Sequence, residues 1–295
     1  MDFISEPFGV IMNFFYRYVA FENYGLSIIL FTLLTRIILF PLTLKQQKSM
    51  AMTQDLQPKL KEISDNYGDD REKLSMEQQK LYQKYGVNPM AGCLPMLIQF
   101  PLIIAIYQIV RNPLQYISGL SSDVILKLGQ AWQTAQGIAA DKLYKAADAV
   151  DQLAVNSHFL SASSETLAAN GVSAGDFINM DFLGIFNLGA TPWQALKNVF
   201  DGDFALAALI LIPILATGTT YLSQWITTGM KKKKKEVQDS TQQATNTMLK
   251  LMPLMTLYFA FVLPAALGFY WFIGNLLSLL QTIIMNKFFV KKKEG

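Results

Sequence analysis

Cysteine and histidine are almost absent, since the 295-residue sequence has one of each. A single cysteine excludes a disulfide framework and any zinc site built on cysteines. A single histidine excludes every metal centre with several histidine ligands and leaves little room for histidine-based catalysis. The sequence also lacks the GxxxxGK[ST] motif that binds nucleotide phosphates. We therefore expect no metal and no cofactor.

Charged side chains are also scarce, at 16% of the sequence, whereas soluble domains carry about 25%. Hydrophobic residues make up 52% and aromatic residues 12%, and the mean hydropathy is +0.26. This composition excludes a disordered chain and argues against an ordinary cytosolic globule. We expect an all-α integral membrane protein.

Long apolar runs are what the sequence has instead. About 20 apolar residues in a helix cross the hydrocarbon core of a bilayer, and Pro264 divides the last apolar block into two short helices. We predict five transmembrane helices, at residues 23–44, 89–110, 203–228, 247–263 and 266–286.

Lysine and arginine are distributed unevenly between the connecting segments. Residues 45–88 hold eight and residues 231–235 are five consecutive lysines, whereas the longer segment 111–202 holds only five basic residues. Because positive residues stay on the cytoplasmic side, five spans place the N-terminus outside and the C-terminus in the cytoplasm. Residues 229–246 then form a basic cytosolic loop, and residues 287–295 form a basic cytosolic tail.

Residues 45–88 are predicted to form a cytosolic helical hairpin. Apolar residues recur at helical spacing along two arms, and a strong turn signal, NYGDD, lies between them at residues 66–70. Pro58 is expected to kink or restart the first arm. The alternative is a solvated linker, because mixed charges alone do not make a binding site.

Two segments are expected on the outer side. Residues 1–22 carry apolar residues at helical spacing and are predicted to lie as an amphipathic helix in the outer interface, with an extended first span as the alternative. Residues 111–202 form the extracytoplasmic loop, with helical periodicity near residues 141–153. Within this loop we expect His158 to be exposed and non-catalytic, and residues 180–188 to touch the outer membrane surface.

One cation lies within the predicted spans. Arg36 is eight residues before Leu44, or about 12 Å along a helix, which is too deep for easy contact with the cytosol. An arginine at membrane depth costs roughly 2.5–3.5 kcal/mol, and none of the five span cores contains Asp or Glu. Arg36 must therefore face protein or water, and it is available to attract an acidic group from outside.

Polar residues share helical faces on several of the spans. They imply a hydrophilic cavity around the arginine. The alternative is that they form hydrogen bonds between helices, each worth about 0.6 kcal/mol. The predicted groove residues are Arg36, Thr32, Thr35, Gln99, Thr220, Gln224, Trp271, Asn275, Ser278 and Thr282.

Three motifs resemble those of the YidC membrane protein insertases. They are RIILFPL at residues 36–42, NPMAGCLPMLIQFP at residues 88–101, and PAALGFYW at residues 264–271 with Met252-Pro253 before it. The resemblance covers the five-span core and the cytosolic hairpin. It is closest in form to the short bacterial type, a relative of the mitochondrial and thylakoid oxidase-assembly insertases.

The resemblance implies an insertase and chaperone of the bacterial plasma membrane, not an enzyme, that acts as a monomer, alone or with the Sec translocon. It implies a groove open to the cytosol and to lipid but closed toward the outside, with Arg36 at its centre. The implied partners are nascent membrane proteins, the lipid bilayer and the ribosome, which would contact the basic loop and tail without reading a nucleic-acid sequence. The hairpin residues expected to recruit substrate or ribosome-linked factors are Met52, Leu56, Lys59 and Lys61.

Two other functions fit the sequence less well. A small-anion transporter or channel would use Arg36 as its binding charge, but it predicts paired broken helices or an internal repeat, and neither is clear. An intramembrane enzyme needs a nucleophile–base pair or metal ligands in the spans. Cys93 is the only thiol there, and no span core contains histidine or a carboxylate.

Overall fold

A computed structural model describes residues 2–68, 70–87, 94–227 and 240–288. Helices account for nearly all the regular structure in these ranges, and the two β-strands found there pair as one short antiparallel hairpin. The predicted all-α fold class is confirmed.

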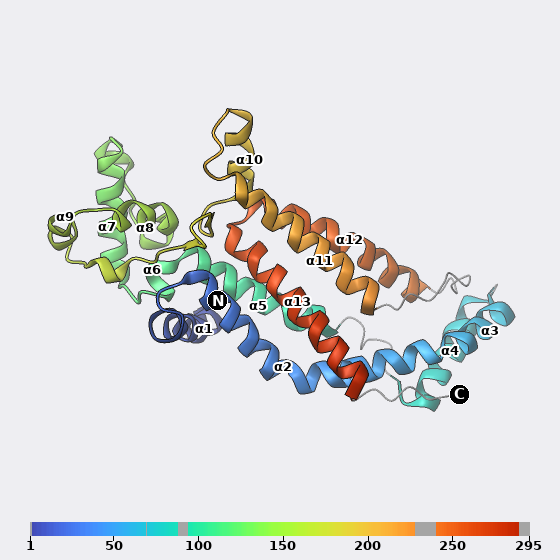
Figure 1. The fold of residues 1–295 in the computed structure, drawn as a ribbon. Coiled ribbons are helices and arrows are strands. Elements are labelled where there is room, and N and C mark those ends of the chain that lie inside the picture. Colours follow the sequence, from blue (N-terminus) through green and yellow to red (C-terminus); the bar gives the residue numbers. More distant parts are fainter. Residues whose placement is uncertain (1, 69, 88–93, 228–239, 289–295) are drawn as a thin grey trace.

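Five apolar helices form the long bundle in Figure 1: α2 (Tyr24–Asp55), α5 (Leu94–Arg111), α11 (Leu211–Thr227), α12 (Ser240–Val262) and α13 (Ala265–Phe288). Three segments are long and apolar enough to cross a membrane, namely Tyr24–Ser49, Ala207–Ile226 and Ala265–Met285. The other two helices, α5 with 18 residues and α12 with 23, include the apolar stretches Gln99–Arg111 and Leu251–Val262. The chain is therefore a multi-pass membrane protein, and the number of five crossings stays a prediction.

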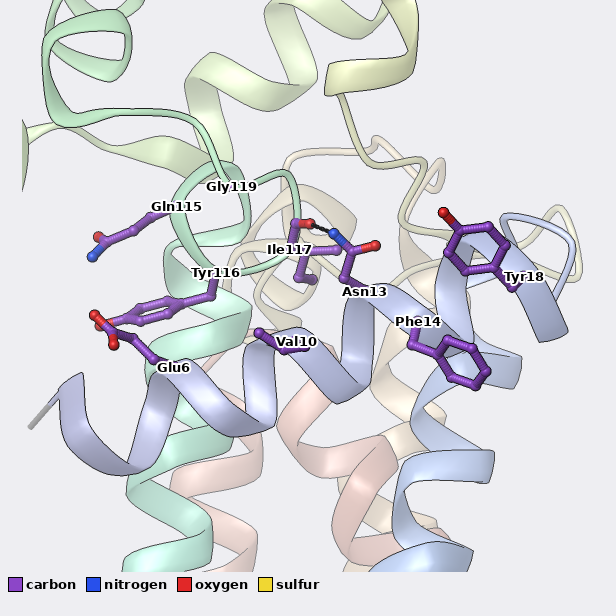
Figure 2. Close-up of a pocket in the computed structure, with 9 residues that line it drawn as sticks. All are labelled: Glu6, Val10, Asn13, Phe14, Tyr18, Gln115, Tyr116, Ile117 and Gly119. Atoms are coloured by element: carbon purple, nitrogen blue, oxygen red, sulfur yellow. Dashed lines mark hydrogen bonds between the residues drawn. The ribbon is translucent and has the colours of Figure 1, made fainter.

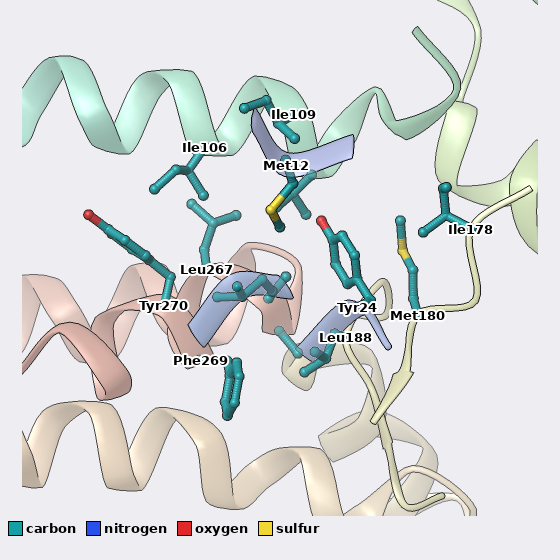
Figure 3. Close-up of a cluster of buried hydrophobic side chains, with 14 of the residues drawn as sticks. Met12, Tyr24, Ile106, Ile109, Ile178, Met180, Leu188, Leu267, Phe269 and Tyr270 are labelled. Carbon is teal, nitrogen blue, oxygen red and sulfur yellow. The ribbon is translucent and has the colours of Figure 1, made fainter. Parts of the chain in front are cut away.

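Helix α13 packs against α11, α2, α12 and α5 and so lies at the centre of the bundle. At one end of the bundle its first turns join the main apolar core, where Leu267 lies with Tyr24 and Ile106 from the neighbouring helices (Figure 3). The outward faces are also apolar, as Ile37 and Ile38 of α2 show by their exposure. Exposed apolar surface on this scale fits a hydrocarbon surrounding.

Helix α2 is 32 residues long, about 48 Å, and continues well past Leu44 to Asp55 (Figure 1). Helix α3 (Gln57–Tyr67) then begins with Pro58 in its first turn, where a missing N–H costs no helical hydrogen bond. Helix α4 (Arg71–Tyr85) is capped by Asp70, whose carboxylate accepts a hydrogen bond from the Lys73 backbone N–H at 3.1 Å. Helices α3 and α4 pack together around Leu56, Leu60 and Val87.

At the end of the bundle that holds the main core, α1 (Asp2–Phe14) runs into a π-helical turn, η1 (Phe15–Val19), and packs on α5 and α2. The Tyr16 hydroxyl accepts a hydrogen bond from the Asn179 backbone N–H at 3.0 Å, and burial raises the pKa of this hydroxyl. A cavity of about 590 Å³ lies between α1 and residues 115–119, as Figure 2 shows. The Asn13 amide bridges its two walls by donating a hydrogen bond to the Ile117 carbonyl.

The segment between α5 and α11 builds a second apolar core from four short helices, α6 (Pro113–Tyr116), α7 (Ser122–Ala135), α8 (Gln152–Leu160) and α9 (Ser164–Ala169). The helical periodicity near residues 141–153 corresponds to the 3-10 turns η3 (Ala140–Lys142) and η4 (Ala147–Ala149) and to the start of α8, not to one continuous α-helix. The Asp151 carboxylate accepts a hydrogen bond from the Ala154 N–H at 3.2 Å, which fixes the start of α8 at this point. Val150, just before it, is buried in the second core.

His158 lies in the last turn of α8 and is half-buried, not exposed as expected. Its ring meets the Phe159 ring edge-on, with 5.0 Å between the ring centroids. Packing against this aromatic neighbour accounts for the partial burial.

After the 3-10 turn η5 (Ala174–Asp176), strands β1 (Asp181–Phe182) and β2 (Phe186–Asn187) form the hairpin. The expectation that residues 180–188 touch the membrane surface is wrong for Met180 and Leu188, which are buried in the main core. The Phe182 ring lies against Gly25 of α2 and 5.1 Å from the ring of Phe269 in α13. The hairpin therefore fills the gap between the first turns of α2 and α13.

Candidate functional site around Arg36

Arg36 lies on α2 and faces α13. Its Nη2 donates a hydrogen bond to the Gly274 carbonyl at 2.9 Å. A Cβ at position 274 would lie 3.3 Å from this nitrogen, so a glycine there allows the guanidinium to approach the backbone. The only ion pairs between described residues belong to α4 and its cap, Lys73–Asp70 and Lys80–Glu77. Within the described part of the chain, Arg36 therefore has a neutral partner and no carboxylate.

Thr32, one turn before Arg36, and Thr35, directly before it, are buried, but their hydroxyls do not point to it. The Thr32 Oγ1 donates to the Ile28 carbonyl at 2.6 Å, and the Thr35 Oγ1 donates to the Thr32 carbonyl at 2.8 Å. Both hydroxyls are thus satisfied within α2. The Thr32 methyl group lies near Gly274 and so supplies a small side chain to the contact between α2 and α13.

Asn275 joins α13 to α11. Its Nδ2 lies 2.8 Å from the Thr220 Oγ1 and 3.3 Å from the Ala216 carbonyl. The Thr220 hydroxyl in turn donates to the Ala216 carbonyl at 2.8 Å. For this pair the structure has the interhelical hydrogen bond that was the alternative to a cavity.

Gln99 joins α5 to α13, because its Nε2 donates to the Tyr270 hydroxyl at 2.9 Å. Tyr270 is buried in the main core. Tyr270 and Gly274, which accept the hydrogen bonds of Gln99 and Arg36, were not predicted as site residues. The signal for Tyr270 was a phenol inside an apolar run, and Gly274 had none beyond its position next to Asn275.

A fourth polar contact lies nearer the α3–α4 end of the bundle. The Gln47 Nε2 of α2 donates to the Thr282 Oγ1 of α13 at 2.9 Å. Gln46 and Gln281 are buried on the same two helices, and the Gln46 Nε2 and both amide atoms of Gln281 have no hydrogen-bond partner within the described part of the chain. A buried amide group left in this way costs about 1–3 kcal/mol, so this part of the α2–α13 contact has unused hydrogen-bonding capacity.

The remaining predicted groove residues, Gln224, Trp271 and Ser278, are half-buried. Trp271 packs against the main core. None of the ten predicted groove residues lines the 590 Å³ cavity, which belongs to α1 and residues 115–119 (Figure 2).

The four predicted recruitment residues separate in the structure. Leu56 is in the core of the α3–α4 hairpin, whereas Met52, Lys59 and Lys61 are exposed. The Lys59 ammonium donates a hydrogen bond to the Tyr85 hydroxyl of α4, and this bond lowers the pKa of the hydroxyl. Lys59 thus ties the two arms together as well as carrying charge on the surface.

Several expectations fall on residues outside the described ranges: the lysines at 231–235, most of the 229–246 loop and 287–295 tail, and Cys93 with the first six residues of the 88–101 motif. Among the described residues, no group of three His, Cys, Asp or Glu side chains is placed to hold a metal ion.

Apolar helices joined by polar contacts around a membrane-embedded arginine define a helical membrane protein with a polar intramembrane site. The model of the family described as 60Kd inner membrane protein matches residues 14–293. The chain belongs to this family, and the resemblance to the YidC insertases is confirmed.

The similar proteins include a membrane protein insertase YidC from Campylobacter jejuni, 29% identical over 293 residues that make up 98% of this chain and 39% of that protein. The inner membrane ALBINO3-like protein 2 of Chlamydomonas reinhardtii chloroplasts is 30% identical over 90% of this chain and 50% of its own length. A YidC insertase from Nitratidesulfovibrio vulgaris is 43% identical over 113 residues, 38% of this chain and 21% of that protein. The chain thus spans half or less of these relatives. They give no support to the small-anion transporter.

Proposed function

We propose that this chain is a membrane protein insertase whose substrate site is a hydrophilic groove centred on Arg36. The observation that carries the proposal is the arginine on a membrane helix that binds a backbone carbonyl and, among the described residues, no carboxylate. A carbonyl satisfies one donor of the guanidinium but leaves its charge uncompensated. The family membership and the printed names of the relatives support insertion as the activity.

The uncompensated charge gives the groove its substrate preference. A carboxylate about 4 Å from the guanidinium would gain about 4 kcal/mol at an effective dielectric constant near 20. Nascent segments with an acidic region next to an apolar helix would therefore enter first. The apolar helix then leaves into lipid, and its transfer to hydrocarbon supplies the driving force.

The amide groups of Gln46 and Gln281 are buried without a hydrogen-bond partner among the described residues, so a small opening of the α2–α13 contact would offer them to water or substrate on the α3–α4 side of Arg36. The polar contacts through Gln99 and Asn275 hold α5 and α11 against α13 and so give the groove stable walls. Phe182 and the hairpin around it would close the opposite end. This arrangement favours entry from the α3–α4 side.

Short helices would assist the crossing. The apolar run at residues 248–263, most of it in α12, has 16 residues and is about 24 Å long at 1.5 Å per residue, against about 30 Å of hydrocarbon. A bilayer that adapts to this segment becomes thinner next to the groove. A thinner bilayer lowers the cost of moving a hydrophilic segment across.

The lysine-rich segments place the N-terminus outside and the C-terminus in the cytoplasm of a bacterial cell, with five crossings of the plasma membrane. The exposed Met52, Lys59 and Lys61 then face the cytosol and would recruit nascent chains or ribosome-linked factors. The Sec translocon is the further expected partner, and the functional unit is a monomer.

The test compares Arg36→Ala and Arg36→Lys in proteoliposomes, using short substrates with acidic or neutral leading segments. The alanine variant should insert the acidic substrates about tenfold more slowly, which corresponds to about 1.4 kcal/mol, and the lysine variant should retain most of the rate because the charge remains. Arg111→Ala is the matched control, since Arg111 is an exposed arginine in the last turn of α5, outside the proposed groove.

Insertion of the acidic substrates by the Arg36→Ala variant at the wild-type rate, with a folded protein, would contradict the proposal. Solute-specific uptake into liposomes that hold the purified protein would favour a transporter instead.

A further inference from the structure

Helix α10 (Pro192–Phe200) has more apolar surface than the rest of the protein covers. Pro192 and Ala195 are buried against the bundle. Trp193, Lys197 and Phe200 follow one another at i, i+4 and i+7 on a neighbouring side of the helix, where Trp193 is 48% and Phe200 82% exposed. An exposed aromatic pair on an amphipathic helix requires a second apolar partner.

The position of α10 identifies the partner as the bilayer. The helix packs on the 3-10 turn η6 (Ala207–Ile210) and on α12, and it projects from the end of the α11–α12 pair that is remote from α3 and α4 (Figure 1). Exposed apolar side chains also lie at the adjoining ends of these two membrane helices. They are Leu211 and Ile214 at the start of α11 and Val262 at the end of α12. The apolar surface of α10 therefore continues into the lipid-facing surface of two membrane helices.

The chemistry of the exposed side matches the depth of the lipid headgroups. The Lys197 Nζ lies 5.8 Å from the centroid of the Trp193 ring, so the ammonium and the indole lie side by side on the helix surface. Tryptophan is enriched at this depth, and a lysine stem covers apolar surface while its ammonium stays in water. Asp201 and Asp203 follow the helix and outnumber its single lysine, so attraction to anionic lipid is not what holds it.

We propose that α10 lies on the phospholipid surface, with Trp193 and Phe200 at the boundary between headgroups and acyl chains and Lys197 at the phosphates. The partner is the lipid surface itself, recognised by its apolar interior and not by net charge. The helix then holds the ends of α11 and α12 at a set depth. This inference depends only on the chain being a membrane protein, so it does not stand or fall with the insertase proposal.

The test attaches an environment-sensitive NBD fluorophore to single cysteines in a Cys93→Ala background, in phosphatidylcholine vesicles. Phe200→Cys and Trp193→Cys report on the apolar side. Gln194→Cys is the matched control, because Gln194 is exposed on a different side of the same helix. Labels at 200 and 193 should emit at shorter wavelength, be quenched by lipids brominated near the headgroup, and show about threefold less quenching by aqueous iodide than the label at 194, as a membrane-facing side requires.

Replacing part of the phosphatidylcholine with anionic phosphatidylglycerol should leave these differences unchanged. Equal iodide quenching at all three positions would overturn the proposal. Burial of the labels that appears only in anionic vesicles would also overturn it, because electrostatic adsorption would then be the cause. Two reporter positions guard against one label that disturbs the helix.

Discussion

Substituting Gly25 by alanine should destabilise the protein, because the residue lies directly under Phe182. A Cβ at position 25 would overlap the aromatic ring and lie only 2.8 Å from its Cε2. The ring cannot simply rotate away, since it also packs against Phe269. Overpacking of this kind costs about 1–3 kcal/mol. The gain in helix propensity from Gly to Ala is about 1 kcal/mol in a helix interior and smaller in the first turn of α2, so a net loss remains.

The double variant separates the clash from other effects. In a Phe182→Ala background the new methyl group at position 25 has space, so Gly25→Ala should be neutral or slightly stabilising there. The cycle should give a coupling energy of about 1–3 kcal/mol, as is found for residues in contact. Equilibrium unfolding in mixed micelles, followed by helical circular dichroism, measures the unfolding free energy of the wild type and the three variants. If Gly25→Ala costs the same with and without the Phe182 ring, the hairpin does not pack between α2 and α13 as described.

Three smaller changes test the polar contacts. Tyr270→Phe removes the acceptor of the Gln99 amide and should lower the unfolding free energy by about 1 kcal/mol; no change would mean that water replaces the phenol. Asn275→Ala removes the links from α13 to α11 and should cost about 1–2 kcal/mol in the same assay. Asp70→Ala removes the cap of α4 and should cost about 1 kcal/mol, with faster amide hydrogen exchange in the first turn of α4 and unchanged exchange in α7 as the control.

The apolar helices and the position of Arg36 followed directly from the sequence. Apolar runs and their proline breaks mark helices because the bilayer requires every backbone group to be paired within the segment. The neutral surroundings of Arg36 followed from the absence of Asp and Glu in the spans. These properties depend on one segment at a time, so one sequence was enough.

The contacts between helices could not be predicted from the sequence. Gly274 and Tyr270 become site residues only because α13 packs between α2 and α5, and Gln47 only because α2 continues past the apolar run. Helical periodicity gives the side of a helix but not its neighbour. The burial of Met180 and Leu188 was missed for the same reason, since an apolar run fits a core and a membrane surface equally well.

The length of α2 has a mechanical consequence. Arg36 and Asp55 belong to one continuous helix, so about 28 Å of helix, with Pro41 inside it and a bend along its course (Figure 1), connects the arginine to the base of the α3–α4 pair. The Arg36–Gly274 and Gln47–Thr282 hydrogen bonds hold this helix to α13 at two heights. A force that tilts the α3–α4 pair is transmitted along α2 and reaches the Gln47–Thr282 hydrogen bond before the Arg36–Gly274 hydrogen bond. Any force on the α3–α4 pair would therefore reach these two hydrogen bonds through helix α2, with no loop in between.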